Sequence, residues 1–306
     1  MIDIPPFRPP SEANSYLIRV IRGCDWNKCK FCRMYKSIKF QIRRKEEILK
    51  DIDNIHRFFP KSHTAFLGDS NPLIHPQIHE IIEYLKKKYP EIDRITAYAR
   101  AKTIANMPSE KLKTLRDAGL TRVHIGLESG NDEVLKLVNK GTCSKELVKA
   151  GKKAVKYFEL TYYVIIGLGG IERSKEHIKD TANIINLVKP TFVRVRSLTV
   201  FPNTPLRTLI GKEITPLNAS QQLNELKMLI EKIKVPTYLT CDHVFNYIFT
   251  IHGVILFRGV HGYLPNEKDR MLEEIESTKD LINALERSGI PVYTYNQMYK
   301  MGLTLI

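Results

Sequence analysis

The repeated alternation of strand-like and helix-like segments between residues 15 and 206 restricts the fold more than any other feature. Six short runs rich in β-branched and aromatic residues are each followed by a turn and then by a helical apolar period. Parallel strands joined by right-handed helical crossovers bury such alternating segments. Six units are too few to close an eight-stranded barrel. We therefore predict an α/β fold, a partial (β/α)6 TIM-type barrel, with strands at 15–22, 63–67, 94–99, 122–127, 160–166 and 192–200.

The flanking segments lack this alternation. Residues 1–14 contain four prolines, which predict an irregular lead-in segment. After residue 206, two amphipathic patterns at 221–234 and 266–286 predict helices. We expect residues 207–306 to form a C-terminal α-rich extension that closes the mouth of the barrel formed by residues 15–206.

Several of the predicted strands carry polar side chains on one face. Residues two apart in a strand share a face, and a partial barrel can leave its concave face open to a ligand. The alternative is that these polar residues lie at solvent-exposed strand ends. The pairs that share a face are Tyr98 and Arg100, His124 and Glu128, and Arg194 and Arg196.

The composition is that of a globular chain with an excess of positive charge. The 306 residues carry a formal net charge of +15. Solvated helix faces, an anionic small-molecule substrate and an RNA surface would each explain this charge. No apolar run is long enough for a membrane span, the N-terminus has no signal-peptide pattern, and the five cysteines do not suggest a disulfide framework. We expect a cytoplasmic protein.

Three of the five cysteines fall within nine residues, directly after the first predicted strand. Cys24, Cys29 and Cys32 have the spacing C-x4-C-x2-C. A structural zinc site requires four ligands, so zinc would need a distant His or Cys143 as well. A four-iron cluster can be held by three thiolates, which leaves one iron open for chemistry.

At this loop the chain resembles the radical S-adenosylmethionine (SAM) superfamily, whose signature is three clustered cysteines with an aromatic residue before the last. Phe31 has that aromatic position. The resemblance implies a [4Fe–4S] cluster on Cys24, Cys29 and Cys32 with SAM on the open iron. It also implies an external electron donor of the flavodoxin or ferredoxin type. Reductive cleavage of SAM would give a 5′-deoxyadenosyl radical that abstracts hydrogen from a substrate.

The resemblance is most detailed for an uncharacterised subgroup related to anaerobic coproporphyrinogen oxidase-like and methylthiotransferase-like proteins. The shared segments are RGC-x-W-N-x-C-x-F-C, G-L-E-S-G and K-G-T. Gly68, Asp69 and Ser70 lie where the family has a turn that binds the amino group of SAM. Glu128 resembles the residue that meets the ribose or the amino acid part of SAM, and a carboxylate can accept hydrogen bonds from two ribose hydroxyls.

The last two strand ends carry further expected cofactor contacts. Gly167 and Gly169 resemble the family's glycine segment near adenine, where glycines permit close approach of the backbone. No acidic residue follows at the dinucleotide-binding distance, so this run does not indicate a Rossmann site. Leu198 begins a segment similar to one that flanks adenine. Arg194 and Arg196 could grip the carboxylate of SAM or of the substrate.

The extension offers Cys241 and His243 as donors or acceptors of a proton or hydrogen atom near substrate, and the alternative is that they belong to a packed, hydrogen-bonded turn. Three functions remain open from the sequence. The first is a radical SAM enzyme acting on a small anionic molecule, the second is the same chemistry on tRNA or another RNA, and the third is a non-catalytic metal-binding adaptor.

Overall fold

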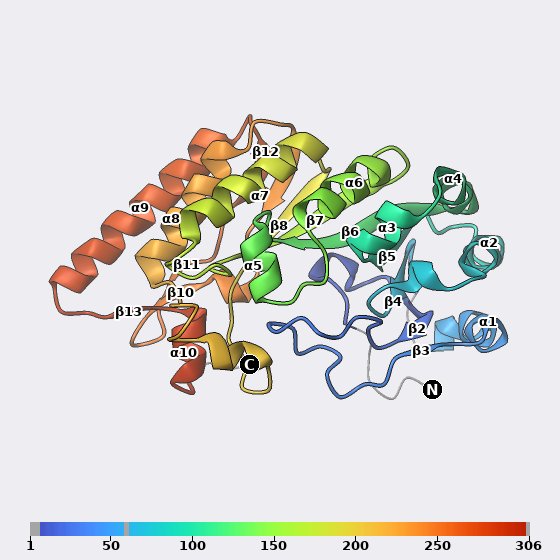
Figure 1. The fold of residues 1–306 in the computed structure, drawn as a ribbon, viewed down its shortest axis with the longest axis horizontal. Coiled ribbons are helices and arrows are strands. Elements are labelled where there is room, and N and C mark those ends of the chain that lie inside the picture. Colours follow the sequence, from blue (N-terminus) through green and yellow to red (C-terminus); the bar gives the residue numbers. More distant parts are fainter. Residues whose placement is uncertain (1–6, 58–60, 304–306) are drawn as a thin grey trace. The chain divides into compact units, whose positions relative to one another are not determined.

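The computed structural model describes residues 7–57 and 61–303 (Figure 1). These residues form two compact units, which are described separately. Unit 1 contains residues 7–28, 32–126 and 149–161, and unit 2 contains residues 29–31, 127–148 and 162–303. Three elements have residues in both units: β6 (Leu120–Glu128), α6 (Ser144–Ala154) and β7 (Glu159–Ile166).

Unit 1 contains the first predicted strand-helix repeats. Its strands are β1 (Tyr16–Arg19), β2 (Ile21–Arg22), β3 (Gln41–Ile42), β4 (Thr64–Gly68), β5 (Arg94–Ala99) and most of β6. Its helices are α1 (Lys45–Asp53), α2 (Ile78–Lys88), α3 (Ala101–Asn106) and α4 (Ser109–Ala118), with short 3-10 turns η1 (Pro10–Glu12), η2 (Ile55–Arg57) and η3 (Pro72–Ile74).

The sheet of unit 1 is parallel, with the order β1-β4-β5-β6. The apolar residues on the faces of β5 and β6 opposite Tyr98 and His124 are buried: Ile95, Ala97, Val123 and Ile125. The helices supply the matching apolar faces, as α2 does with Ile78, Ile81, Ile82 and Leu85. In Figure 1, α2 lies between α1 and α4, and both helices contact it. Helix α4 ends at Gly119, whose φ of 120° favours glycine.

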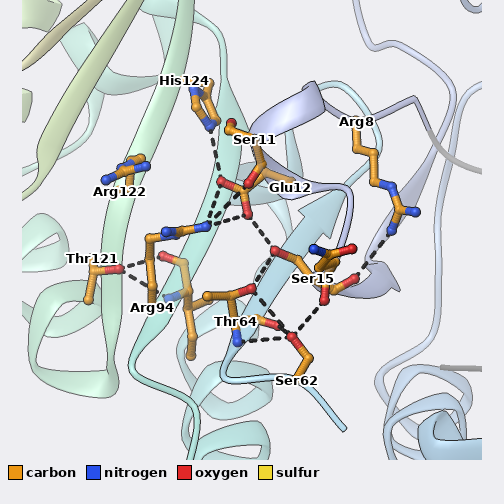
Figure 2. Close-up of polar contacts among 12 residues, drawn as sticks. Arg8, Ser11, Glu12, Ser15, Ser62, Thr64, Arg94, Thr121, Arg122 and His124 are labelled. Atoms are coloured by element: carbon orange, nitrogen blue, oxygen red, sulfur yellow. Dashed lines mark hydrogen bonds and ion pairs between the residues drawn. The ribbon is translucent and has the colours of Figure 1, made fainter. Parts of the chain in front are cut away.

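The lead-in segment of unit 1 is tied to the strands by a buried polar cluster (Figure 2). Residues 1–6 of this predicted segment lie outside the described residues. The Glu12 carboxylate is fully buried, lies 3.3 Å from the Arg94 guanidinium and accepts a hydrogen bond from Ser15 at 2.6 Å. His124 Nε2 lies 3.8 Å from the same carboxylate. Because Ser15 also bonds to Thr64 at 2.7 Å, the cluster links the lead-in to three strands.

Unit 2 begins with the later repeats and continues through the C-terminal extension. Its helices are α5 (Asp132–Leu137), α7 (Ser174–Val188), α8 (Ala219–Lys232), α9 (Lys268–Arg287) and α10 (Tyr295–Lys300). Its strands are the end of β7, β8 (Phe192–Ser197), β9 (Thr237–Thr240), β10 (Ile248–Thr250), β11 (Ile255–Phe257), β12 (His261–Leu264) and β13 (Val292–Thr294), with 3-10 turns η4 (Pro205–Leu209) and η5 (Val244–Asn246).

The extension adds strands that the sequence analysis did not predict. Strand β9 continues the sheet parallel to β8, and β12 pairs with β9 in antiparallel orientation. A second sheet has the order β11-β10-β13. The two predicted helices are present as α8 and α9. The strands escaped prediction because none exceeds four residues, which is too short for a reliable alternating pattern.

Helices α7, α8 and α9 form a layer in which α8 contacts both neighbours (Figure 1). Helix α8 begins with a capping box, in which Asn218 and Gln221 bond to each other's backbone. Its buried face holds Leu223, Leu226 and Leu229 together with the carboxylate of Glu225, which is also fully buried.

All six predicted strands between residues 15 and 206 are present, and the strands that pair within each unit are parallel apart from β12 and the small sheets. The predicted α/β class, with a mostly parallel central sheet, is confirmed. Within the described residues, no helix is both long and apolar enough to cross a bilayer.

Candidate active site

The cysteine loop begins in unit 1 with a compact set of backbone contacts. The Asn27 N–H donates to Cys24 Sγ at 3.3 Å. The Asn27 side chain donates to the Tyr35 carbonyl oxygen at 2.7 Å, and Lys36 donates to the Asn27 carbonyl oxygen at the same distance. Asn27 has a φ of 46°, a conformation that asparagine tolerates better than most residues. These contacts shape the turn between Cys24 and Cys29.

The turn after β4 holds the residue before the first cysteine. The Asp69 carboxylate accepts the Gly23 N–H at 2.8 Å and lies 3.3 Å from Arg19. Ser70 donates its hydroxyl to the Gly23 carbonyl oxygen at 2.9 Å. Burial raises the pKa of Asp69, an effect that Gly23 and Arg19 oppose. Both carboxylate oxygens of Asp69 therefore have partners within the protein, which gives this turn a role in fixing the loop. Contact of Gly68, Asp69 and Ser70 with SAM remains a prediction.

In unit 2, the middle of the loop contacts the K-G-T segment. The Lys30 N–H donates to the Val138 carbonyl oxygen at 2.8 Å. The Cys29 thiol lies 3.8 Å from the Lys140 carbonyl oxygen, a weak contact for a thiol donor. The Leu206 N–H donates to the Lys30 carbonyl oxygen at 2.9 Å. These three contacts place residues 29–31 against two segments that the sequence had singled out separately.

Lys140 links the aromatic residue of the loop to the end of β6. Its ammonium donates to Glu128 Oε1 at 2.8 Å and lies 5.8 Å from the centroid of the Phe31 ring. Glu128 has a φ of 59°, which turns the chain sharply where β6 ends. The structure therefore brings together Phe31 and Glu128, two of the predicted site residues.

Helix α7 supports the turn that follows Glu128. His177 Nε2 donates to the Ile165 carbonyl oxygen at 3.0 Å, so its Nδ1 accepts from the Ser129 hydroxyl at 2.8 Å. Burial lowers the pKa of His177 to about 4, which keeps the ring neutral. Gly130 is required here, because an added Cβ would lie 2.3 Å from the Asp180 carbonyl oxygen. The ends of β6 and β7 are thus held by one buried imidazole.

The predicted glycine loop after β7 is held from the extension. The Gly167 N–H donates to Glu225 of α8 at 2.6 Å. Burial raises the pKa of Glu225 to about 7, against the hydrogen bonds from Ser174 and Gly167. An added Cβ at Gly169 would lie within 3.2–3.3 Å of Arg173 and His177. The loop is therefore packed closely on α7 and α8. Whether Gly167 and Gly169 approach adenine remains a prediction.

Leu198 packs against the Gly167 loop and against other apolar side chains. It is 8% exposed and belongs to an apolar cluster with Val134, Val138 and Leu168. Phe31 packs against the same cluster. The cluster explains how residues from the cysteine loop, α5 and the end of β8 keep a fixed arrangement within unit 2. Contact of Leu198 with adenine is not tested by this packing.

The two arginines of β8 lie on the same sheet face and are partly buried, as the period of two predicted. The Arg196 guanidinium lies 5.4 Å from the centroid of the Tyr163 ring. Arg194 Nε is buried without a hydrogen-bond partner. Neither guanidinium has a carboxylate within ion-pair distance among the described residues.

The two residues proposed from the extension differ in accessibility. Cys241 is fully buried and its N–H donates to the Val260 carbonyl oxygen at 2.8 Å. Burial, with Asp242 adding to it, raises the pKa of its thiol. His243 is partly exposed, and burial together with the Arg196 charge lowers its pKa to about 4. Of the two, only His243 has a side chain that a substrate could reach.

The cysteines provide a donor set that suits an iron–sulfur cluster. Cys24, Cys29 and Cys32 are not in disulfides, and all three are partly exposed. Throughout residues 7–57 and 61–303, no three His, Cys, Asp or Glu side chains are gathered closely enough to hold a metal ion. The fit therefore rests on the chemistry of the donors: three cysteine side chains in one loop are the ligands that iron–sulfur clusters prefer.

Sequence reasoning missed the residues that connect these motifs. They are Lys140, Tyr163, His177 and Glu225. One of them left a usable signal: Glu225 is an acid within the apolar face of α8. Lys140 belongs to the K-G-T segment, but its partner Glu128 is twelve residues away. No local pattern indicates such a pairing.

The parallel strands, the cysteine loop and the motifs at the strand ends define an α/β enzyme of the partial TIM-barrel class. The profile of the radical SAM superfamily matches residues 18–185, which is more than half of the chain. The chain belongs to the radical SAM superfamily. Members of this superfamily bind a [4Fe–4S] cluster and SAM, so the predicted cofactors are confirmed.

Individual relatives are distant. The chain is 23% identical over 270 residues to an uncharacterized methyltransferase of Pyrococcus horikoshii, covering 81% of this chain and 56% of that protein. It is 21% identical to the heme chaperone HemW of Bacillus subtilis, covering 88% and 73%. Coproporphyrinogen III oxidase (HemN) from Escherichia coli shares the fold, with a TM-score of 0.54, 17% identity and coverage of 71% and 51%. The chain thus spans little more than half of the first relative.

Proposed function

We propose that this chain is a radical SAM enzyme that abstracts a hydrogen atom from a small anionic substrate. Cys24, Cys29 and Cys32 would hold the [4Fe–4S] cluster. A cluster bound there would supply the electron for reductive cleavage of SAM, the chemistry that generates a 5′-deoxyadenosyl radical. An external donor of the flavodoxin or ferredoxin type would supply that electron, in a cytoplasmic setting that agrees with cysteines that form no disulfides.

The observation that carries the proposal is the contact between the cysteine loop and the end of β6. Phe31, Lys140 and Glu128 are joined by a cation–π contact and a 2.8 Å ion pair. Three motifs that are separate in the sequence therefore meet within unit 2. This meeting supports a binding function for Glu128, because a buried carboxylate with one oxygen held by Lys140 presents a fixed acceptor to a ribose hydroxyl.

The extension would shape the substrate end of the site. In this proposal residues 15–206 form the catalytic barrel and residues 207–306 close it. Two contacts support the role of the extension: Glu225 holds the Gly167 loop at 2.6 Å, and Asn246 donates to the Val195 carbonyl oxygen of β8 at 2.9 Å. Gly23, gripped by Asp69 and Ser70, would keep Cys24 in position.

Anaerobic reconstitution tests the proposal. The wild-type protein should take up iron and sulfide, show the absorption and electron paramagnetic resonance spectra of a [4Fe–4S] cluster, and form 5′-deoxyadenosine from SAM with dithionite. Cys29→Ala should lose the cluster and at least about 100-fold of the SAM cleavage rate, because a thiolate ligand is removed.

Cys143→Ala is the matched control, since Cys143 is likewise partly exposed and outside any disulfide but does not belong to the loop. It should retain cluster and cleavage. Equal loss in both variants, or full turnover by Cys29→Ala, would contradict the ligand assignment. Absence of any cubane cluster in the wild type would reject the enzyme function proposed here.

A further inference from the structure

The two arginines of β8 carry positive charge in a partly buried place without an acidic partner. Among the described residues, no carboxylate lies within ion-pair distance of Arg194 or Arg196, and Arg194 Nε is buried without a hydrogen-bond partner. Removing a guanidinium from water without a counter-charge costs free energy, and two like charges on one face increase that cost. The position of both guanidiniums on one face of β8 therefore points to a negatively charged ligand.

Other partly buried arginines of this protein show what a structural role looks like. Arg94 pairs with Glu12 at 3.3 Å, Arg100 with Asp25 at 2.8 Å and Arg43 with Asp51 at 2.6 Å. Each of these has a carboxylate of the same unit as its partner. The two arginines of β8 have no such carboxylate partner, which distinguishes them from arginines whose role is to stabilise the fold.

The surroundings of the pair are aromatic and come from three adjacent strands of unit 2. Residues two apart on a strand have Cα atoms separated by about 6.6 Å, so one small molecule can contact both guanidiniums. Tyr163 of β7 lies against Arg196 at 5.4 Å. On the other side, β9 places Thr240 opposite Arg194 and Tyr238 opposite Phe192. The face therefore combines fixed guanidiniums with flat apolar rings.

His243 adds a neutral donor beside Arg196. Its Nδ1 accepts the Phe245 N–H at 3.1 Å, so the ring proton of the neutral form is on Nε2. Burial and the Arg196 charge lower its pKa to about 4, so it does not add a third positive charge near neutral pH. Asn246 fixes the segment to β8: it donates to the Val195 carbonyl oxygen at 2.9 Å and accepts from Ser197 at 3.0 Å.

We propose that Arg194 and Arg196, with Tyr163 and His243 beside Arg196, bind the carboxylate of a substrate whose adjoining part is flat and apolar. This inference rests on the proposed function and specifies its substrate class. A guanidinium stacked on a ring presents two parallel N–H groups in a fixed plane, the geometry that a carboxylate accepts. Partial burial favours a small molecule over an RNA backbone, which requires exposed basic side chains along its path.

The probe is phenylacetate, with neutral phenylacetamide as its matched control, measured by ligand-observed NMR titration on the reconstituted protein at low millimolar concentration. The wild type should bind phenylacetate and not phenylacetamide. Arg194→Gln and Arg196→Gln should each weaken phenylacetate binding at least about tenfold, because each removes charged hydrogen bonds. Arg258→Gln, which alters an exposed arginine stacked on Tyr247 of the same unit, should leave binding unchanged.

SAM affinity and cluster content are measured on the same samples and should not change in any of the three variants. If both β8 variants weaken SAM binding by the same factor and leave phenylacetate unaffected, the pair binds the SAM carboxylate and the inference is overturned. Equal binding of phenylacetamide, no binding of phenylacetate by the wild type, or its displacement by bulk tRNA in an Arg196-dependent manner would also overturn it.

The outcome for the proposed function is distinguishable from these. If the wild-type protein binds phenylacetate through the arginines but forms no cluster and no 5′-deoxyadenosine, the carboxylate site is supported and the proposed radical chemistry fails. A protein that cleaves SAM normally but binds no carboxylate keeps the chemistry and loses the site.

Discussion

The Glu12 cluster of unit 1 and the β8 arginine pair of unit 2 place cationic side chains on strands in opposite ways. Arg94 has a fully buried carboxylate at 3.3 Å, and the same carboxylate accepts from Ser15 (Figure 2). Arg194 and Arg196 have aromatic and polar neighbours but no carboxylate within ion-pair distance in the described part of the chain. The first arrangement is complete without a ligand, and the second is not.

This difference separates stabilising charges from binding charges. A buried ion pair with additional hydrogen bonds is costly to break, because the remaining partner is left uncompensated. An unpaired guanidinium already lacks a counter-charge in the ligand-free protein, so replacing it with a neutral side chain should not lower the free energy of unfolding. Glu225 is an intermediate case: it is a fully buried carboxylate that accepts from Gly167 and has no cationic partner among the described residues.

The largest expected effect concerns the paired charge. Glu12→Ala should lower the free energy of unfolding by about 3 kcal/mol, because Arg94 loses its buried counter-charge. Denaturant titration measures this loss. Glu46→Ala, at an exposed position on α1, should change stability by less than about 0.5 kcal/mol. If the two substitutions had equal effects, the buried Glu12 carboxylate would contribute no more to stability than an exposed one.

The next effect concerns pH and the lone carboxylate. Because the folded pKa of Glu225 is raised to about 7, its contribution is fully present below its unfolded pKa and is lost as pH rises through about 7. Stability of the wild type relative to Glu225→Gln should therefore fall between pH 5 and pH 8, on the order of 2 kcal/mol. Parallel curves for the two proteins across this range would show that Glu225 does not titrate there.

The contribution of Glu12 to stability should depend on pH in the opposite direction to that of Glu225. Burial raises the pKa of Glu12, but the hydrogen bond from Ser15, the nearby His124 and the charge of Arg94 together hold it below its usual value. Its contribution is present above its unfolded pKa and is lost as pH falls through the lower folded value. The stability difference between the wild type and Glu12→Ala should therefore shrink in acid, measured by denaturant titration from pH 6 downward. If the stability difference grew in acid, the folded protein would not lower the pKa of Glu12.

A smaller effect is expected for the unpaired arginines. Arg196→Gln should leave the free energy of unfolding unchanged or raise it by up to about 1 kcal/mol, since it removes a partly buried charge that lacks a partner. Thermal unfolding of the apo protein compares this variant with Glu12→Ala. A loss of stability as large as that of Glu12→Ala would show that Arg196 has a structural role.

The smallest effect is a local pKa change. Because the Arg196 charge is the second cause of the low pKa of His243, after burial, Arg196→Gln should raise that pKa while keeping it below the ordinary value of 6.5. NMR titration of labelled histidine in the two proteins measures the shift. An unchanged His243 pKa would show that Arg196 and His243 do not share one electrostatic environment.

The sequence by itself determined the strands between residues 15 and 206 and the cofactor class. The six strands follow from local apolar patterns, so their positions could be predicted from the chain, whereas the short strands of the extension could not. Three cysteines within nine residues also form a local pattern, and they restrict the ligand chemistry wherever the loop lies. These features depend on spacing along the chain, which a sequence contains.

Only the tertiary structure decided which charges are paired. Glu12 and Arg94 are 82 residues apart, and Gly167 and Glu225 are 58 apart. Asp69, expected at SAM, has its oxygens on Gly23 and Arg19, while Arg194 and Arg196 have no comparable partner. In the sequence each of these residues is only a charge on a strand or helix. Pairing depends on burial and on distances between remote segments, so the fold alone separates charges that hold the protein together from charges that await a ligand.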